Sequence, residues 1–165
     1  MKFVIFGGSF DPWTSAHQEI TERLSACYDR VLVIPTAVRY YKANTQMFTF
    51  DQRFEAAAEK TASLGNVSIS DIERNVDGSW RFVNTLEEVI ERNGKENEYF
   101  VAIGSDSLQN FTTWYQWEKI LKLSRLVVFN RPGYTDGFPD IPYEYLPMEN
   151  RISSTEMRKK ILEGK

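Results

Sequence analysis

A single histidine follows a glycine-rich turn near the start of this 165-residue chain, where residues 7–17 read GGSFDPWTSAH. Four apolar residues, 3–6, precede the glycines, as expected for a parallel strand buried on both faces. Glycines let the backbone turn sharply and let a ligand approach it closely. Beyond Pro12 a helix can begin, and its first N–H groups and its dipole favour an anion. This order of strand, turn and helix predicts a phosphate-binding site.

Two side chains of this stretch have the chemistry to act on the phosphate. Thr14 and His17 are three positions apart, so on a helix they share one face. We therefore expect the hydroxyl and the imidazole to point toward the bound anion, and we expect His17 to be partly exposed. The backbone would add contacts from Gly7, Gly8, Ser9 and Phe10.

A second candidate phosphate site lies near the carboxyl terminus, where residues 152–158 read ISSTEMR. Ser153 followed three residues later by Glu156 is typical of a capping box at a helix start. Ser154 then lies in the first turn and Arg158 one turn further on. Their hydroxyl and guanidinium groups, with the exposed N–H groups, suit several phosphate oxygens. A helix start that binds no ligand is the alternative.

A third stretch, residues 103–108, reads IGSDSL and follows an apolar run. Gly104 would let the backbone approach a nucleoside, and the Asp106 carboxylate could accept hydrogen bonds from ribose hydroxyls. A helix-capping role for Asp106 is the alternative. Further along, Trp117 lies three residues before Ile120 and four before Leu121, a spacing typical of packing in the core.

Short apolar runs alternate with helical patterns along the chain. This alternation implies right-handed crossovers and a doubly wound, Rossmann-like parallel sheet in one domain over residues 1–165. Ligands of such sheets bind beyond the carboxyl ends of the strands, where the glycine-rich turn lies. We expect residues 132–147 to form a long loop. The expected strands are 3–6, 31–34, 67–69, 99–103 and 126–129, and the expected helices lie at 50–62, around 82–90 and at 117–123.

Composition excludes several classes of protein. The net charge of −3 argues against a general nucleic-acid binder, whose affinity rests on basic residues. No apolar run approaches the roughly 20 residues that span a bilayer, and the first apolar stretch is too short for a signal peptide, so we expect a cytoplasmic protein without a membrane partner. Cys27 is the one cysteine, which excludes an internal disulfide and predicts a buried thiol. The oligomeric state stays open, a homo-oligomer included.

Three motifs in the same order resemble those of a known enzyme group. Residues 7–17 resemble the GGSFDPxHxGH signature of the adenylyltransferase branch of the nucleotidylyltransferase superfamily, with Ala16 where a glycine is usual. Residues 152–158 look like the ISSTxxR element of that family. The GSDSL run, the FxxWxxW spacing of residues 111–117 and the NRPGY of residues 130–134 resemble bacterial nicotinate-nucleotide adenylyltransferases. The resemblance covers nearly the whole chain.

The resemblance implies transfer of AMP from ATP to nicotinate mononucleotide, giving deamido-NAD and pyrophosphate. Mg²⁺ is expected with the ATP, because it offsets the triphosphate charge while keeping much of its water. The implied catalytic residues are Thr14 and His17 at the α-phosphate and Arg158, with Ser154, at the departing pyrophosphate. The implied ATP-binding residues are Gly7, Gly8, Ser9, Phe10, His17, Gly104, Asp106, Ile152, Ser153, Ser154 and Arg158.

The acceptor region departs most from the family pattern. Relatives carry Pro-Pro-His-Lys or Pro-Pro-His-Arg where residues 39–42 read RYYK, which keeps the basic Lys42, and Ser-Tyr-Thr where residues 80–82 read WRF. Arg81 would suit the carboxylate of nicotinate, whereas Trp80 could stack on a neutral nicotinamide. The acceptor-binding candidates are Lys42, Trp80, Arg81, Phe82 and Trp117. The resemblance implies that an aromatic residue stacks on the pyridine ring, and Trp117 is expected in this role ahead of Trp114.

Four alternatives to this activity differ in how well the sequence supports them. The acceptor could be nicotinamide mononucleotide, or pantetheine phosphate, although the latter offers no pyridine ring for the tryptophans. A non-catalytic nucleotide sensor is a third alternative, but it need not retain groups that act in the transition state. A dehydrogenase is disfavoured because GGSFDP lacks the GxGxxG spacing.

Overall fold

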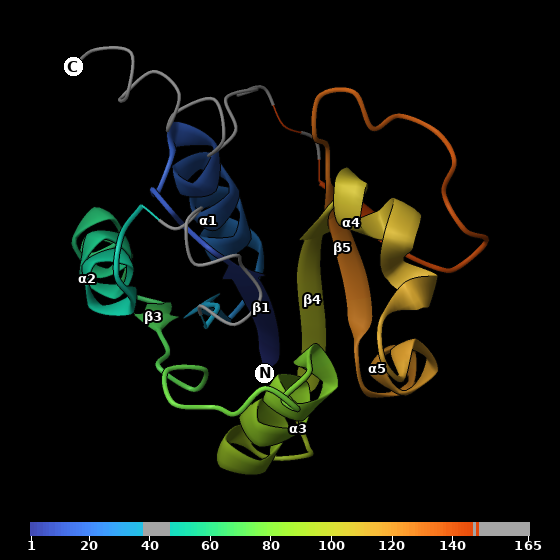
Figure 1. Cartoon of the computed structure of the whole chain (residues 1–165), viewed down its shortest axis with the longest axis horizontal. Coiled ribbons are helices and arrows are strands. Elements are labelled where there is room, and N and C mark those ends of the chain that lie inside the picture. Colours follow the sequence, from blue (N-terminus) through green and yellow to red (C-terminus); the bar gives the residue numbers. More distant parts are fainter. Residues whose placement is uncertain (38–46, 147, 149–165) are drawn as a thin grey trace.

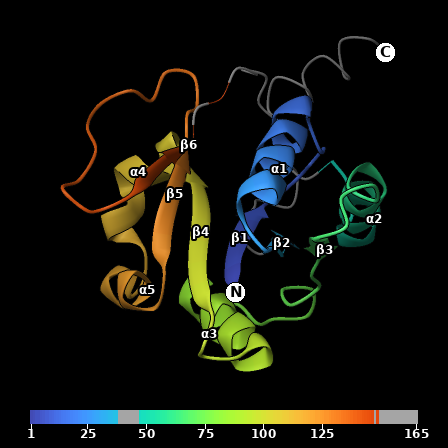
Figure 2. The same cartoon turned by 180° about the vertical axis from the view of Figure 1, so that it is seen from behind.

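The computed structural model describes residues 1–37, 47–146 and 148. In this part of the chain, six parallel strands form one sheet in the order β3-β2-β1-β4-β5-β6. Helices cover both faces of the sheet (Figures 1 and 2). The strands are β1 (Lys2–Gly8), β2 (Arg30–Pro35), β3 (Val67–Ile69), β4 (Glu98–Gly104), β5 (Arg125–Phe129) and β6 (Glu144–Leu146). The helices are α1 (Ser15–Cys27), α2 (Phe50–Lys60), α3 (Phe82–Asn93), α4 (Ser105–Asn110), the 3₁₀ helix η3 (Phe111–Thr113) and α5 (Trp117–Leu123).

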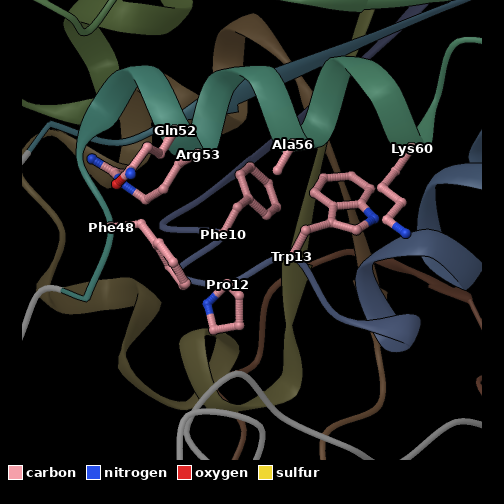
Figure 3. A pocket seen from close by; sticks show the side chains of 8 residues that line it. All are labelled: Phe10, Pro12, Trp13, Phe48, Gln52, Arg53, Ala56 and Lys60. Atoms are coloured by element: carbon pink, nitrogen blue, oxygen red, sulfur yellow. The ribbon is translucent and has the colours of Figure 1, made fainter. Parts of the chain in front are cut away.

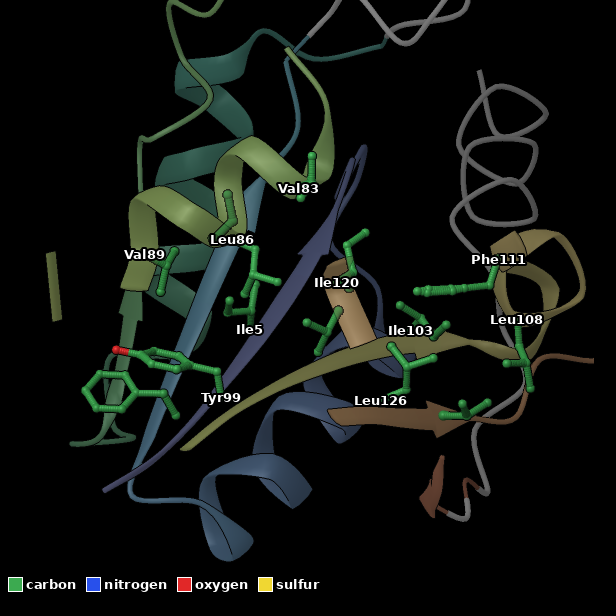
Figure 4. Close-up of a cluster of buried hydrophobic side chains, with 14 residues drawn as sticks. Ile5, Val83, Leu86, Val89, Tyr99, Ile103, Leu108, Phe111, Ile120 and Leu126 are labelled. Carbon is green, nitrogen blue, oxygen red and sulfur yellow. The ribbon is translucent and has the colours of Figure 1, made fainter. Parts of the chain in front are cut away.

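Alternate residues of the central strand β1 point into two separate cores, because successive side chains of a strand face opposite sides of the sheet. Phe3 and Ile5 pack with residues of α3, α4 and α5 (Figure 4). Val4 and Phe6 pack on the other face with residues of α1 and α2. Both cores are apolar and well buried, and they hold the sheet whose strand ends carry the polar groups described below.

Local signals explain where the main helices begin and end. α2 opens with a capping box in which Thr49 Oγ1 accepts from the backbone of Gln52 and Gln52 Oε1 accepts from the backbone of Thr49. α3 buries residues at helical spacing, among them Leu86 and Val89, and it ends at Gly94, whose φ of 105° suits glycine. These helices therefore form where the sequence predicts them.

The sequence predicted the sheet well but missed its edge. All five expected strands are present within the observed ones, and the doubly wound parallel fold is confirmed. The prediction that residues 132–147 form only a loop is wrong, because β6 pairs in parallel with β5. This three-residue strand is mostly exposed and has no buried apolar run to reveal it. The extent of the domain over residues 1–165 stays a prediction.

Two further expectations concern membranes and the cysteine. Among the described helices, none combines the length and apolarity that a bilayer span requires. Cys27 is exposed, so the predicted burial of its thiol is wrong. It is the last residue of α1, beyond the buried positions Ile20 and Leu24 that face the sheet.

Candidate active site

The segment after β1 forms the floor of the candidate site. The strand continues through Gly7 and Gly8, and the residue with a left-handed backbone is Phe10, whose φ is 51°. The prediction that the glycines make the sharp turn is therefore wrong. Phe10 tolerates this conformation because its ring is fully buried against Phe6, with 5.2 Å between centroids. A side chain on Gly8 would crowd this ring, with a Cβ only 3.2 Å from it.

Thr14 and His17 meet in a reciprocal capping box at the start of α1. Thr14 Oγ1 accepts from the backbone N–H of His17 at 3.2 Å, and His17 Nδ1 accepts from the backbone N–H of Thr14 at 2.9 Å. Thr14 is the N-cap rather than a helical residue, so the expectation that both share one helix face is wrong. Because Nδ1 accepts a hydrogen bond, the neutral imidazole carries its proton on Nε2. The Nε2–H group is then a donor of fixed orientation.

His17 is only 7% exposed, which corrects the expectation of partial exposure. The rings of Phe10 and Trp13 lie 5.0 and 5.5 Å from the imidazole, centroid to centroid. This burial, together with the positive charge of Arg131, lowers the pKa of His17 from 6.5 to about 3. The imidazole is therefore neutral near pH 7, and its Nε2–H group can donate a hydrogen bond to an anion.

Arg131 is a site residue that the sequence reasoning did not single out. It follows β5, and its backbone N–H donates to Ser105 Oγ at 2.8 Å, which ties the end of β5 to the start of α4. A Cβ on Gly104 would come within 2.9 Å of Arg131 Cγ, so the arginine stem passes close over the end of β4. The available signal was a basic residue two positions after a buried strand, at the ligand-binding edge of a parallel sheet.

Gly104 and Asp106 lie together at the end of β4, as predicted from their spacing. Gly104 is the N-cap of α4 and no side chain caps this helix, so the alternative that Asp106 serves as its cap is wrong. A Cβ on Gly104 would collide with the Asp106 carboxylate. The carboxylate is thus held against the strand end, where it can accept hydrogen bonds from hydroxyl groups.

A cavity of about 390 Å³ lies between the end of β2 and the segment after α4. Arg81 and Phe82 line it, as the acceptor prediction requires. Trp114 lines it as well, with its ring 5.6 Å from that of Phe82, centroid to centroid. The remaining lining residues are Thr36, Glu73, Thr113 and Tyr115. The cavity therefore combines aromatic walls with a cation and a buried carboxylate.

Two predicted tryptophans lie outside this lining. Trp117 is half-buried at the start of α5, where it packs against the core and against the Phe111 ring. Trp80 Nε1 donates to Thr85 Oγ1 at 2.8 Å, and that hydroxyl donates to Glu73 Oε2 at 2.8 Å. Trp80 thus holds a buried polar chain in place behind the cavity.

Several predicted site residues lie outside the described part of the chain. They are Lys42, Ile152, Ser153, Ser154 and Arg158. Within the described part, no group of three or more His, Cys, Asp or Glu side chains is arranged to hold a metal ion.

Comparisons with known proteins agree with this architecture. Residues 5–160 match the family described as cytidylyltransferase-like. A probable nicotinate-nucleotide adenylyltransferase from Fusobacterium nucleatum is 33% identical over an alignment of 172 positions, which covers 98% of this chain and 88% of that protein. The protein of the same description from Aliarcobacter butzleri is 30% identical over 98% of this chain and 88% of its own length.

Two solved structures share the fold. The Plasmodium falciparum nicotinic acid mononucleotide adenylyltransferase complexed with NaAD has a TM-score of 0.76 at 19% identity, covering 96% of this chain and 82% of its own. A putative nicotinate-nucleotide adenylyltransferase from Vibrio parahaemolyticus has a TM-score of 0.70 at 24% identity, covering 99% and 88%.

The chain thus belongs to the cytidylyltransferase-like family, and it is a nucleotidyltransferase. Within that family it is a member of the nicotinate-nucleotide adenylyltransferases, because the relatives named above match almost its whole length. The predicted family, fold and enzyme class are confirmed.

Proposed function

We propose that this chain transfers AMP from ATP to nicotinate mononucleotide, forming deamido-NAD and pyrophosphate. The observation that carries the proposal is the cavity at the strand ends, where Trp114 and Phe82 offer aromatic faces beside the cation of Arg81. A pyridine ring suits the aromatic faces, and its carboxylate suits the guanidinium. The names of the curated relatives point to the same acceptor.

The transfer needs positioning and charge stabilisation rather than a covalent enzyme intermediate. A phosphate oxygen of the acceptor attacks the α-phosphorus of ATP in line, and the bond to the β-phosphate oxygen breaks, so pyrophosphate leaves with the electron pair. We assign to the neutral His17 a hydrogen bond from Nε2–H to an α-phosphate oxygen. The positive charge of Arg131, which contributes to the lowered pKa of His17, would stabilise the same oxygens.

The other predicted residues complete the proposed site. Thr14 would orient the His17 imidazole through the capping box. Asp106 would accept hydrogen bonds from the ribose of ATP, while Ser154 and Arg158 would hold the β- and γ-phosphates. Lys42 would bind the acceptor phosphate. Mg²⁺ would arrive with the triphosphate, keep several of its waters and offset the triphosphate charge.

We assign the ring contact with the acceptor to Trp114 instead of Trp117, because only the former of the two lines the cavity. Arg81 donates to the carbonyl oxygens of Gly78 and Trp80 at 2.9 and 3.1 Å, which fixes its guanidinium at the cavity rim. It would select the carboxylate of nicotinate.

One observation favours a second acceptor. Glu73 is buried and lines the same cavity, and its carboxylate would repel that of nicotinate but would accept from the amide of nicotinamide. Nicotinamide mononucleotide is therefore the second candidate.

The test uses purified protein, ATP and Mg²⁺ with nicotinate mononucleotide, nicotinamide mononucleotide or pantetheine phosphate, and it measures pyrophosphate release. We expect the nicotinate form to react best. Arg81→Gln should lower kcat/KM for that acceptor about 10-fold, as expected for loss of a charge-assisted hydrogen bond. The same variant should leave the nicotinamide form nearly unchanged. If every acceptor fails while ATP still binds, the chain is a nucleotide sensor.

We further propose that the enzyme acts in the cytoplasm on free nucleotides. The net charge of −3 supports this proposal, because polymeric nucleic acid is bound mainly through excess positive charge.

A further inference from the structure

Two buried charged side chains join the phosphate-binding segment after β1 to the start of α2. The Asp11 carboxylate, in a residue 3% exposed, accepts from the backbone N–H groups of Met47 and Phe48 at 2.9 and 2.8 Å. Arg53, which is 2% exposed, donates from Nη1 to the carbonyl of Ser9 at 2.8 Å. Each segment thus contributes one charged side chain to the hydrogen bonds that join them.

The same nitrogen of Arg53 also reaches the acceptor side of the site. Arg53 Nη1 donates to the carbonyl of Thr36 at 2.9 Å. Thr36 follows β2 and lines the cavity that we assign to the acceptor, and its own N–H donates to the carbonyl of Gly8 at 2.9 Å. One guanidinium therefore bonds the phosphate-binding backbone and the edge of the acceptor cavity at once.

Packing alone does not require an arginine at this position. Figure 3 shows Arg53 near Phe10 and Phe48, at the end of an apolar cavity away from Lys60. An aliphatic side chain would suit such neighbours, and removing a guanidinium from water is costly unless its hydrogen bonds are fixed. The carbonyl groups it meets belong to segments far apart in the sequence, so one guanidinium joins both of them beyond the last paired residues of β1 and β2.

We propose that Arg53 is a positioning residue of the transfer reaction. It holds Ser9 and Thr36 at a fixed separation, and so sets the distance between the acceptor phosphate and the α-phosphorus of ATP. This inference rests on the proposed function. In-line attack requires reacting atoms about 3–3.5 Å apart, and a displacement of about 1 Å can lower the rate about 100-fold.

The first test compares the variants Arg53→Gln and Arg53→Lys with a control, Arg23→Gln. Arg23 lies on α1, forms a partly exposed ion pair with Glu19 at 3.6 Å, and lines neither the cavity nor the phosphate-binding segment. Circular dichroism and thermal unfolding give the folded fraction, and kcat is expressed per folded molecule. We expect kcat of Arg53→Gln to fall about 100-fold with KM values changed less. Arg53→Lys should recover part of the loss, because an ammonium group can still donate to these carbonyls. The control should stay within about twofold of the wild type, as expected for a surface ion pair.

A kcat of Arg53→Gln within about twofold of the wild type would overturn the proposal, because the arginine would then serve stability alone. The second test does not depend on activity. Amide hydrogen exchange of Thr36, whose N–H bonds to Gly8, should quicken about 10-fold or more in Arg53→Gln, while that of Val101 in β4 should not change. If Arg53→Gln does not fold, the same exchange measurement is made on Arg53→Lys.

Unchanged exchange at Thr36 would refute the positioning role. A wild-type chain inactive toward every acceptor would instead refute the proposed function, and with it a positioning role in the transfer. Faster exchange at Thr36 in the variant would then show only that Arg53 holds the backbone of Thr36 in place.

Discussion

The buried neutral histidine predicts a specific dependence of stability on pH. The pKa of His17 is about 3 in the folded chain and 6.5 in the unfolded one. Between these values the unfolded chain binds a proton that the folded chain does not. Lowering the pH through this window therefore destabilises the fold, by about 1.4 kcal/mol for each pH unit from this one group. From pH 6.5, where the unfolded imidazole is already half protonated, to pH 4.5 the loss amounts to about 2.3 kcal/mol.

The assay compares the wild type with His17→Gln, because the variant keeps every other titrating group. Urea unfolding followed by fluorescence at pH 7.0, 5.5 and 4.5 gives the free energy of unfolding for each protein. We expect the wild type to lose about 2.6 kcal/mol more than His17→Gln between pH 7.0 and 4.5. Parallel pH profiles of the two proteins would show that His17 titrates normally, and they would refute the neutral buried imidazole on which the proposed donor role depends.

Four other substitutions test the site. His17→Ala should lower kcat about 100-fold or more, as for other lost transition-state donors, and it should also lower the melting temperature because the imidazole is buried; near-normal turnover would contradict its role. Arg131→Gln should weaken ATP binding about 10-fold by isothermal titration calorimetry and raise the pKa of His17 by NMR titration, since a positive charge beside the imidazole is removed; an unchanged imidazole titration would contradict the electrostatic link. Trp114→Ala should raise KM for the acceptor about 10-fold, whereas Trp117→Ala should mainly lower the melting temperature. If steady-state kinetics give the reverse result, the ring contact is made by Trp117 and not by Trp114.

The sheet could be predicted from sequence because its interior strands are buried on both faces. Continuous apolar runs such as residues 31–34 and 126–129 have few alternatives to a parallel strand between two helical layers. β6 lacks this constraint. Its residues are mostly exposed, and its pairing with β5 depends on the path of the chain between them.

The site was predictable in its location but not in its internal contacts. The spacing of Thr14 and His17 placed them together at the anion-binding helix start, yet the capping box that orients the imidazole depends on backbone angles at Thr14. Likewise, the choice between Trp114 and Trp117 depends on the left-handed Gln116 between them, whose φ is 52°. Sequence spacing does not contain these angles.

The most direct test of the account follows the label from ATP carrying ³²P in its α-phosphate, with Mg²⁺ and either pyridine mononucleotide. With nicotinate mononucleotide, we predict that the label moves into deamido-NAD and that one pyrophosphate is released per product. We also predict that kcat/KM for nicotinate mononucleotide exceeds that for nicotinamide mononucleotide by about 10-fold or more, as one charge-assisted contact through Arg81 would give. Label that stays in ATP with both acceptors, or that moves faster into the nicotinamide product, would contradict the account.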